Sequence, residues 1–506
     1  MIILVFLFSL IFITLSTVNA VSASSSVIYV NGSHGNDAND GLTWATAKLT
    51  IKNATGTVSA GGTVNIANGI YIGENNTNIR INKSISIKGQ SKSHTIINGS
   101  NNAQIFKIEK TSTLEDINVI IQNLTIINGN ATHGGAIHNN GTLTIKDCIL
   151  SGNRGTNGGA IYNSGTLTVE NSYFTSNQAY GDGGAIYNTG TSAIKNSYFT
   201  SNIANCYYGG AIYNTGTLNI TSSTFKNNCG NTGDFYGSGA TIYNANILNI
   251  SYSSLDRQKY EGINPSIRNK KGIVNAGLNW WGTNNGPGSY IDGFTVNKWL
   301  VLTINANPSS VLINTNSKIT ADLRYDNTGV LHTEAYLPNG IPVTFATNLG
   351  TISPKAYTVN GITQATLKSA TGGTANVSVI ADSQRLYKSV KIIDYIPPKV
   401  ILTYPKNGAT GVSRTNTIII KFSENIKASY NWPKIYVKNL NTGRIVSISK
   451  SISGNKLYIK MNAKRYAYTW YRVYIPKAAV KDYSSNKLAT YYTFKFKTGK
   501  YPLTYE

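Results

Sequence analysis

Residues 465–474, near the C-terminal end of this 506-residue chain, alternate like a β-strand and are rich in aromatic and basic side chains, and further lysines flank the stretch. Because clustered cations attract anions and aromatic rings stack on sugar rings, this combination predicts a surface that binds an anionic wall polymer or a glycan. A solvated, lysine-rich strand without a ligand is the alternative interpretation. The residues expected to make the contacts are Lys456, Lys460, Lys464, Arg465, Tyr466, Tyr468, Trp470, Arg472, Lys477 and Lys481.

The charge of the chain is concentrated in the same region. The formal net charge is +24, and residues 396–506 hold 20 Lys and Arg against 3 Asp and Glu, whereas residues 24–300 hold 18 against 13. A local excess of this kind indicates a local anionic partner. Nucleic acid satisfies the same electrostatics, but the export signal described next argues against it.

An apolar run from Ile2 to Leu15 opens the chain, and small residues follow at Ala20 and Ala23. The run is short for a bilayer span, so residues 1–23 are expected to be a cleaved signal peptide. No later segment is expected to cross a membrane. The protein is therefore expected to be secreted or held at the cell surface, with no nucleic-acid partner.

Few side chains elsewhere are suited to metal binding or catalysis. Asp37 and Asp40 are a weak candidate pair for Ca²⁺, and a cap turn in which Asx side chains hold the backbone is the favoured interpretation. His133 and His138 lie close together, and His138 occupies a position that is tyrosine in neighbouring repeats. We expect it to be a ring in the same stack, and we expect no cofactor.

The chain has three cysteines, which is too few for a disulfide scaffold. Cys148 takes a repeat position that is otherwise serine, so a small, buried side chain is expected there. Cys206 and Cys229 follow equivalent turns of adjacent repeats, and export makes a disulfide between them possible.

Five similar segments of 24–29 residues follow one another between residues 134 and 255, four of them starting with Gly-Gly-Ala-Ile. Each holds short β-type runs broken by Gly and Asn, too short to enclose a core alone. Stacking the segments as coils pairs each backbone with its neighbours, which predicts a right-handed, single-stranded parallel β-helix over residues 24–300. A leucine-rich horseshoe or a β-propeller fits the unit length and composition less well.

Stacked coils place equivalent side chains in columns. Two asparagine columns are expected to satisfy themselves, because an amide both donates and accepts hydrogen bonds. They consist of Asn153, Asn177, Asn202 and Asn228, and of Asn139, Asn163, Asn188 and Asn214. Two apolar columns are expected inside, formed by Leu150, Phe174, Phe199 and Phe225, and by Ile137, Ile161, Ile186 and Ile212.

The Gly-Gly-Ala-Ile-Tyr-Asn coils resemble repeats of polymorphic-outer-membrane-type proteins and of adhesin-like surface proteins of methanogenic archaea. Residues 29–47 and 62–71 are similar to the N-terminal cap and first coil of pectate-lyase-like β-helices, with a helix expected near Ala45–Asn53. Residues 279–287, with a double tryptophan, resemble the segment that closes such helices. Because lyases, hydrolases and adhesins share this fold, the resemblance implies the fold more firmly than the activity.

An enzyme of this class needs carboxylates that converge from neighbouring coils, either to bind Ca²⁺ or to act as an acid/base pair. In the aligned repeats, Asp147 falls with Asn171, and Glu170 falls with Lys146 and Lys195. No register position carries acids in two adjacent coils. Loop residues Asp182 and Asp234 are the remaining candidate pair, and solvated loop acids are the simpler interpretation.

Beyond Trp299 the pattern changes to alternating strands with turns about every ten residues, which predicts Ig-like β-sandwiches. Residues 301–395 resemble bacterial Ig-like domains of the invasin type. Residues 396–506, after the Pro397-Pro398 joint, resemble the Ig-like domain of S-layer and other surface proteins. The expected fold is all-β: a right-handed parallel β-helix followed by two Ig-like β-sandwich domains.

The expected function is that of an exported, adhesin-like surface protein, with the β-helix displayed on Ig-like modules that attach to a wall polymer, a surface glycan or other cells. The alternative is a secreted polysaccharide lyase or glycoside hydrolase of the pectate-lyase-like class. The sequence leaves the ligand and the oligomeric state open.

Overall fold

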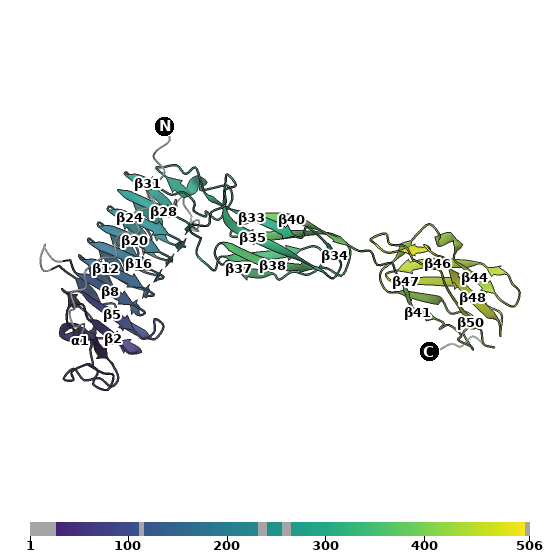
Figure 1. The fold of residues 1–506 in the computed structure, drawn as a ribbon, viewed down its shortest axis with the longest axis horizontal. Coiled ribbons are helices and arrows are strands. Elements are labelled where there is room, and N and C mark those ends of the chain that lie inside the picture. Colours follow the sequence, from purple (N-terminus) through teal and green to yellow (C-terminus); the bar gives the residue numbers. More distant parts are fainter. Residues whose placement is uncertain (1–26, 111–115, 231–239, 256–264, 501–506) are drawn as a thin grey trace.

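A computed structural model describes residues 27–110, 116–230, 240–255 and 265–500. It is an all-β protein in which a stack of coils is followed by two sandwiches in a row, as Figure 1 shows. The expected fold class is therefore confirmed. The expected signal peptide and Asp234 lie outside the described residues.

Four parallel sheets run along the β-helix, and each coil contributes one short strand to three or four of them. The first sheet contains β1 (Val27–Val30), β2 (Thr63–Ile66), β5 (Ile85–Gly89), β8 (Asn118–Gln122), β12 (Thr142–Lys146), β16 (Thr166–Glu170), β20 (Thr191–Lys195), β24 (Thr217–Thr221), β28 (Ile247–Ser251) and β31 (Ile273–Asn275). The second contains β3 (Gly69–Tyr71), β6 (Thr95–Asn98), β9 (Thr125–Ile127), β13 (Ile149–Ser151), β17 (Tyr173–Thr175), β21 (Tyr198–Thr200), β25 (Thr224–Lys226) and β29 (Ser254–Leu255).

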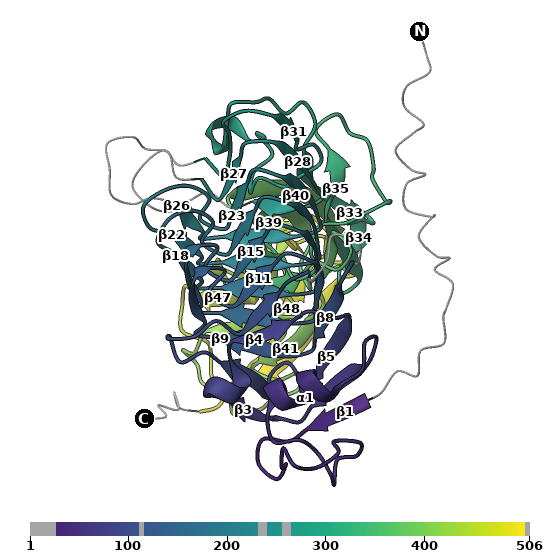
Figure 2. The ribbon, with the colours of Figure 1, turned by 90° about the vertical axis from the view of Figure 1, so that its left-hand side faces the viewer.

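Figure 2 shows the two remaining sheets, one facing the viewer and a shorter one beside it. The third sheet contains β4 (Ile79–Ile81), β7 (Phe106–Ile108), β11 (Ile137–Asn139), β15 (Ile161–Asn163), β19 (Ile186–Asn188), β23 (Ile212–Asn214), β27 (Ile242–Asn244), β30 (Ile267–Asn269) and β32 (Ile291–Asp292). The fourth contains β10 (Asn130–His133), β14 (Arg154–Asn157), β18 (Gln178–Ala179), β22 (Ile203–Ala204) and β26 (Cys229–Gly230).

The predicted columns form as expected. The Asn163 amide donates to Asn188 Oδ1 at 2.7 Å, and Asn188 donates to Asn214 in the same way at 2.7 Å. The second asparagine column repeats this with bonds of 2.8–3.0 Å. Phe174 and Phe199 stack with ring centroids 4.7 Å apart inside the coils. Each buried amide is thus satisfied by the next coil, which removes the cost of placing it inside.

Both ends of the β-helix are covered. The helix α1 (Ile51–Thr57) begins several residues later than expected, because Lys48 still pairs with β1 and Thr50 is the N-cap. At the other end, Trp281 packs into the β-helix core, while Trp280 packs into the core of the next domain. The double tryptophan therefore joins the two domains as well as closing the first. Short 3₁₀ turns are η1 (Glu74–Asn76), η2 (Gly288–Tyr290) and η3 (Trp432–Lys434).

The first sandwich has its own buried core, formed between two sheets. One sheet contains β33 (Leu300–Asn307), β35 (Asn316–Asp326) and β38 (Ile362–Lys368). The other contains β34 (Ser310–Leu312), β40 (Gln384–Ile393), β39 (Gly373–Ala381), β36 (Pro342–Thr347) and β37 (Lys355–Tyr357).

The second sandwich has a third separate core, between two four-stranded sheets. One contains β41 (Val400–Tyr404), β42 (Ile418–Phe422), β47 (Lys456–Met461) and β46 (Ile448–Ser453). The other contains β45 (Ile445–Val446), β44 (Tyr436–Asn439), β48 (Trp470–Ile475) and β50 (Tyr492–Lys497). A small ribbon joins β43 (Lys427–Ala428) to β49 (Val480–Lys481). Within the described ranges, no helix is both long and apolar enough to span a bilayer.

Candidate functional site

Strand β48 alternates as the sequence predicted. Tyr471 and Val473 point into the core of the second sandwich, so Trp470, Arg472 and Tyr474 lie on the outer face of the sheet β45-β44-β48-β50. Neighbouring strands add further side chains to this face. We call it the basic face, and its residues are Tyr436, Lys438, Trp470, Arg472, Tyr474, Lys495 and Lys497.

Three cations lie side by side across the middle of the basic face. Arg472 pairs in register with Lys438 on β44 and with Lys495 on β50. Directly opposed residues on antiparallel strands have Cβ atoms about 5 Å apart, and like charges there are destabilising. The two acidic residues of this domain within the described residues, Glu424 and Asp482, lie outside this sheet. The row therefore carries charge that an external anion can neutralise.

Aromatic rings flank the row of cations. Tyr436 and Tyr474 stack with their centroids 5.0 Å apart, and Tyr491 extends the stack at 5.7 Å from Tyr474. The ammonium of Lys495 lies 5.2 Å from the centre of the Trp470 ring. The face thus combines charge with flat apolar surface.

The structure divides the expected contact residues among several surfaces. Trp470 and Arg472 are on the basic face, whereas Lys456 and Lys460 lie on β47, on the outer face of the opposite sheet. The loop between β47 and β48 carries the exposed residues Lys464, Tyr466 and Tyr468. Lys477 follows β48, and Lys481 pairs with Lys427 in the small ribbon.

Arg465 does not belong to any of these surfaces, which corrects its assignment as a surface contact. It is only 2% exposed, and its guanidinium donates to the carbonyls of Ser413 at 2.7 Å and Asn416 at 2.6 Å. Burial lowers the pKa of Arg465 to about 10. Arg465 lies in the loop between β47 and β48, and its side chain turns inward and ties this loop to the segment 413–416, a direction that the alternation beyond Met461 did not reveal.

Three basic residues of the basic face were missed in the sequence: Lys438, Lys495 and Lys497. Lys495 and Lys497 stand in a clear alternation, Tyr-Thr-Phe-Lys-Phe-Lys, whose two phenylalanines are buried. That pattern predicts a strand with lysines on its outer face, but it does not show which strand this one pairs with. The missing information was the order of strands in the sheet.

Asp37 is fully engaged in the N-terminal cap. Its carboxylate accepts hydrogen bonds from the Leu49 and Thr50 amides at 2.9 Å and from the Thr50 hydroxyl at 2.8 Å. Asp40 accepts from the Leu42 amide, which lowers the pKa of its exposed carboxyl. Both carboxylates thus accept hydrogen bonds from nearby backbone amides, as expected for a cap turn held by Asx side chains.

His138 lies in register with Tyr162, at the end of a column of outward tyrosine rings. Its ring packs edge-on against Tyr162 with centroids 5.2 Å apart, and His133 lies 6.2 Å away. Burial, followed by the nearby charges of Lys107 and His133, lowers the pKa of His138. His138 therefore joins the column of rings at the expected register position, but edge-on and not stacked.

All three cysteines are free, so the structure does not form the candidate Cys206–Cys229 disulfide. Cys229 pairs in register with Ile203, three residues before Cys206. Cys206 lies beyond the end of β22, whereas Cys229 begins β26, so the two cysteines are not opposite each other in adjacent strands. Cys148 is buried in line with Ser172, as expected, and burial raises the pKa of its thiol to about 12.

The register expected for the repeat carboxylates holds, because Glu170 pairs with Lys146 and Lys195 in the adjacent coils. Asp182 instead accepts a hydrogen bond from the Tyr208 amide at 2.8 Å, and burial raises its pKa. Its proposed partner, Asp234, lies outside the described residues. A lyase-type cluster of acids therefore does not form in the described part of the β-helix.

Three carboxylates do lie close together among the described residues, at the junction of the two sandwiches. Ligand oxygens of Asp394, Glu424 and Asp482 lie within 4.8 Å of one another. Both oxygens of the buried Asp482 accept hydrogen bonds from Asn486. Burial, followed by repulsion from Asp482 and Asp394, raises the pKa of Glu424 to about 7. No second feature points to a bound ion, so we assign this group no ligand.

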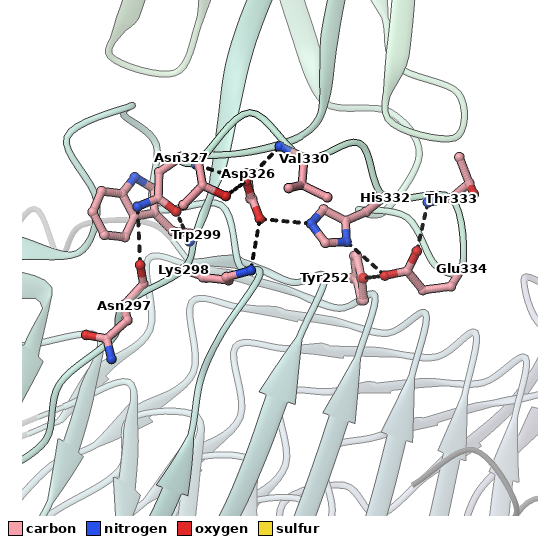
Figure 3. Close-up of polar contacts among 11 residues, drawn as sticks. Tyr252, Asn297, Lys298, Trp299, Asp326, Asn327, Val330, His332, Thr333 and Glu334 are labelled. Carbon is pink, nitrogen blue, oxygen red and sulfur yellow. Dashed lines mark hydrogen bonds and ion pairs between the residues drawn. The ribbon is translucent and has the colours of Figure 1, made fainter. Parts of the chain in front are cut away.

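The β-helix and the first sandwich meet at the polar network drawn in Figure 3. His332 bridges two carboxylates, with Nε2 3.1 Å from Asp326 and Nδ1 2.9 Å from Glu334. Although burial opposes charge, these contacts raise the pKa of His332. The Tyr252 hydroxyl, from the β-helix, donates to Glu334. The network ties the segment after β35 to the last coils.

Two protein families match parts of the chain. The family described as Bacterial Ig-like domain matches residues 394–498, and the Chlamydia polymorphic membrane protein repeat matches residues 171–189. The coil resemblance and the Ig-like nature of the last domain, both expected from the sequence, are thus confirmed at the family level. No curated protein matches the chain.

Solved structures match the chain only distantly. The Yersinia pseudotuberculosis adhesin InvE shares 15% identity over 39% of this chain and 58% of its own, with a TM-score of 0.26. Invasin, a bacterial integrin-binding protein, shares 13% identity over 39% of this chain and 40% of its own, with a TM-score of 0.25. Domains 5–6 of the S-layer protein SbsC share 15% identity over 40% and 99%, with a TM-score of 0.15. At these scores the likeness carries no argument about function.

Proposed function

We propose that this chain is an adhesin-like protein of the cell surface, in which the last Ig-like domain attaches to an anionic wall polymer or glycan and the β-helix is displayed beyond it. The row formed by Lys438, Arg472 and Lys495 carries this proposal. Three in-register cations, with no acid on the same sheet among the described residues, have a stability cost that a polyanion relieves.

The arrangement of the domains supports the same function. The β-helix and the basic domain lie at opposite ends of the molecule, with the first sandwich between them (Figure 1). A protein held by its last domain therefore presents the coils away from the attachment point. The resemblance of the coils to adhesin-like proteins of methanogenic archaea, and the matches to a membrane-protein repeat and an Ig-like domain, are consistent with a surface location.

The test is incubation of the purified protein with polygalacturonate, a polyanion, and with galactan, a neutral polymer of related sugars. Cosedimentation reports binding, and the release of reducing ends or unsaturated products reports cleavage. We expect salt-sensitive binding to polygalacturonate without cleavage, because exposed charges are screened over about 10 Å at 0.1 M salt. Cleavage of the polyanion restores the lyase or hydrolase alternative, and equal binding to galactan contradicts the proposal.

A further inference from the structure

A groove of about 760 Å³ lies where the β-helix meets the first sandwich, far from the basic face. Its floor is the corner between the first two β-helix sheets, and its roof is the segment 334–339 between β35 and β36. Figure 1 shows the two domains meeting at an angle near β31 and β33. The volume falls within the range of about 300–1,000 Å³ that ligand sites usually have, and domain interfaces are a common place for them.

The roof of the groove is fixed to the coils below it. The Ser222 hydroxyl donates to the Tyr336 carbonyl at 2.7 Å, and the Tyr198 hydroxyl donates to the Asn339 carbonyl at 3.1 Å. The hydrogen bond from Tyr252 to Glu334 adds a third link. The groove is therefore formed before any ligand arrives, which reduces the entropy lost on binding.

Two asparagine side chains on the floor of the groove are available for hydrogen bonds to a ligand. Asn171 and Asn196 occupy the same turn position in adjacent coils, are exposed, and make no side-chain hydrogen bond within the described part of the chain. The interior columns differ, because there each amide bonds to the next, as Asn163 does to Asn188. The groove thus offers convergent donors and acceptors at a spacing of one coil, which is about 4.8 Å.

Two ammonium groups also face the groove, and neither forms an ion pair among the described residues, although Glu170 lies beside Lys195 in the adjacent coil. Lys92 lies with its ammonium 5.2 Å from the centre of the Tyr173 ring, and Lys195 ends β20 directly before Asn196. Glu334 is the acid of the lining, and hydrogen bonds from Tyr252, His332 and Thr333 outweigh its burial and lower its pKa to about 2. Its charge is already directed at His332, so Glu334 does not neutralise the two lysines.

Tyr173 and Tyr198 form the wall between the lysines and the roof. Their rings stack with centroids 4.9 Å apart, and Tyr173 is 39% exposed. Few aliphatic side chains accompany them, and Leu337 is buried in the core of the sandwich. A peptide partner needs apolar pockets for anchor residues, whereas polar donors, cations and an exposed ring suit a sugar acid.

We propose that this groove binds an acidic oligosaccharide: Lys92 and Lys195 meet a sugar carboxylate, Asn171 and Asn196 bond hydroxyl groups, and Tyr173 contacts the apolar face of a sugar ring. The proposal is independent of the basic face. It gives the displayed end of the molecule a recognition site of its own.

The experiment is calorimetric titration of the full chain carrying Lys438→Gln, Arg472→Gln and Lys495→Gln, so that the basic face does not contribute. The probes are trigalacturonate and the neutral trisaccharide galactotriose. We expect trigalacturonate to bind and galactotriose to bind at least tenfold more weakly. Lys195→Ala should weaken trigalacturonate binding about tenfold, since it removes a charged hydrogen bond.

Lys146→Ala is the matched control, because Lys146 holds the same register position two coils away and does not line the groove. It should leave binding unchanged. The proposal is overturned if trigalacturonate does not bind, if both trisaccharides bind equally, or if the two lysine variants lose affinity equally. Displacement of the sugar by an aspartate hexapeptide at equal concentration would assign the groove to acidic peptides instead.

Discussion

Arg472 lies directly opposite Lys495 on the neighbouring strands β48 and β50, with both side chains on the outer face of the sheet. Such a pair is unfavourable in the isolated protein, because two like charges face each other at about 5 Å. The arrangement is understandable if a polyanion covers the face. A polyanion that neutralises this pair should therefore also stabilise the last domain.

Removing one charge of the pair should stabilise the unbound protein. Lys495→Thr keeps a strand-forming residue and relieves the repulsion, so the free energy of unfolding of the last domain should rise by about 0.5 kcal/mol at low salt. Urea titration in 10 mM and 500 mM NaCl measures the change. The gain should vanish at high salt, and a gain that persists there would mean that repulsion is not its cause.

Arg465 should matter for folding and not for polymer binding. Arg465→Ala leaves the carbonyls of Ser413 and Asn416 without their donor inside the domain, so we expect a loss of about 3 kcal/mol in unfolding free energy. Arg472→Ala is the control and should cost less than about 0.5 kcal/mol, since Arg472 is exposed. Equal losses in denaturant titrations would contradict the buried position of Arg465.

The interior asparagine column should be sensitive to single changes. In Asn188→Ala the amide of Asn163 loses its acceptor, and Asn214 Oδ1 loses its donor, so the β-helix should lose about 2–4 kcal/mol. Asn196→Ala changes an exposed amide in the next turn, so it should cost only the roughly 1 kcal/mol that alanine costs at a left-handed φ of 49°. Thermal unfolding of both variants tests the column, and matching midpoints would argue against it.

Glu424 should make the joint between the sandwiches pH-sensitive. Its pKa of about 7 is above the ordinary value near 4.5, so the folded chain holds the extra proton and stability falls as the pH rises from about 4.5 to 7. Because the side chain is partly solvated, we expect a loss of only about 1 kcal/mol. Glu424→Gln should remove this dependence in denaturant titrations at pH 5 and pH 8. A variant that keeps the wild-type slope would assign it to another group.

The β-helix was predictable because its unit repeats. Once Ile161, Ile186 and Ile212 are aligned, the stacking of identical coils fixes the register of every other column, including the asparagines. The pairing of Glu170 with Lys146 and Lys195 followed from the same alignment.

The candidate site was predictable only in part, because a sandwich has no such repeat. Alternation in β48 correctly turned Arg472 outward, but Lys456 seemed a neighbour in sequence and belongs to the opposite sheet. Lys438 and Lys495 join Arg472 through long-range pairing that local patterns do not encode. The inward turn of Arg465 likewise depends on loops from another part of the domain.

The most direct test of the account compares the two faces of the last domain. One variant carries Lys438→Gln, Arg472→Gln and Lys495→Gln on the basic face, and the other carries Lys421→Gln, Lys456→Gln and Lys460→Gln on the opposite face. Both lose three charges, so a general effect of net charge is matched. We predict that cosedimentation with polygalacturonate falls at least tenfold for the first variant and less than about twofold for the second. Equal losses, or a larger loss for the second variant, would contradict attachment through the basic face.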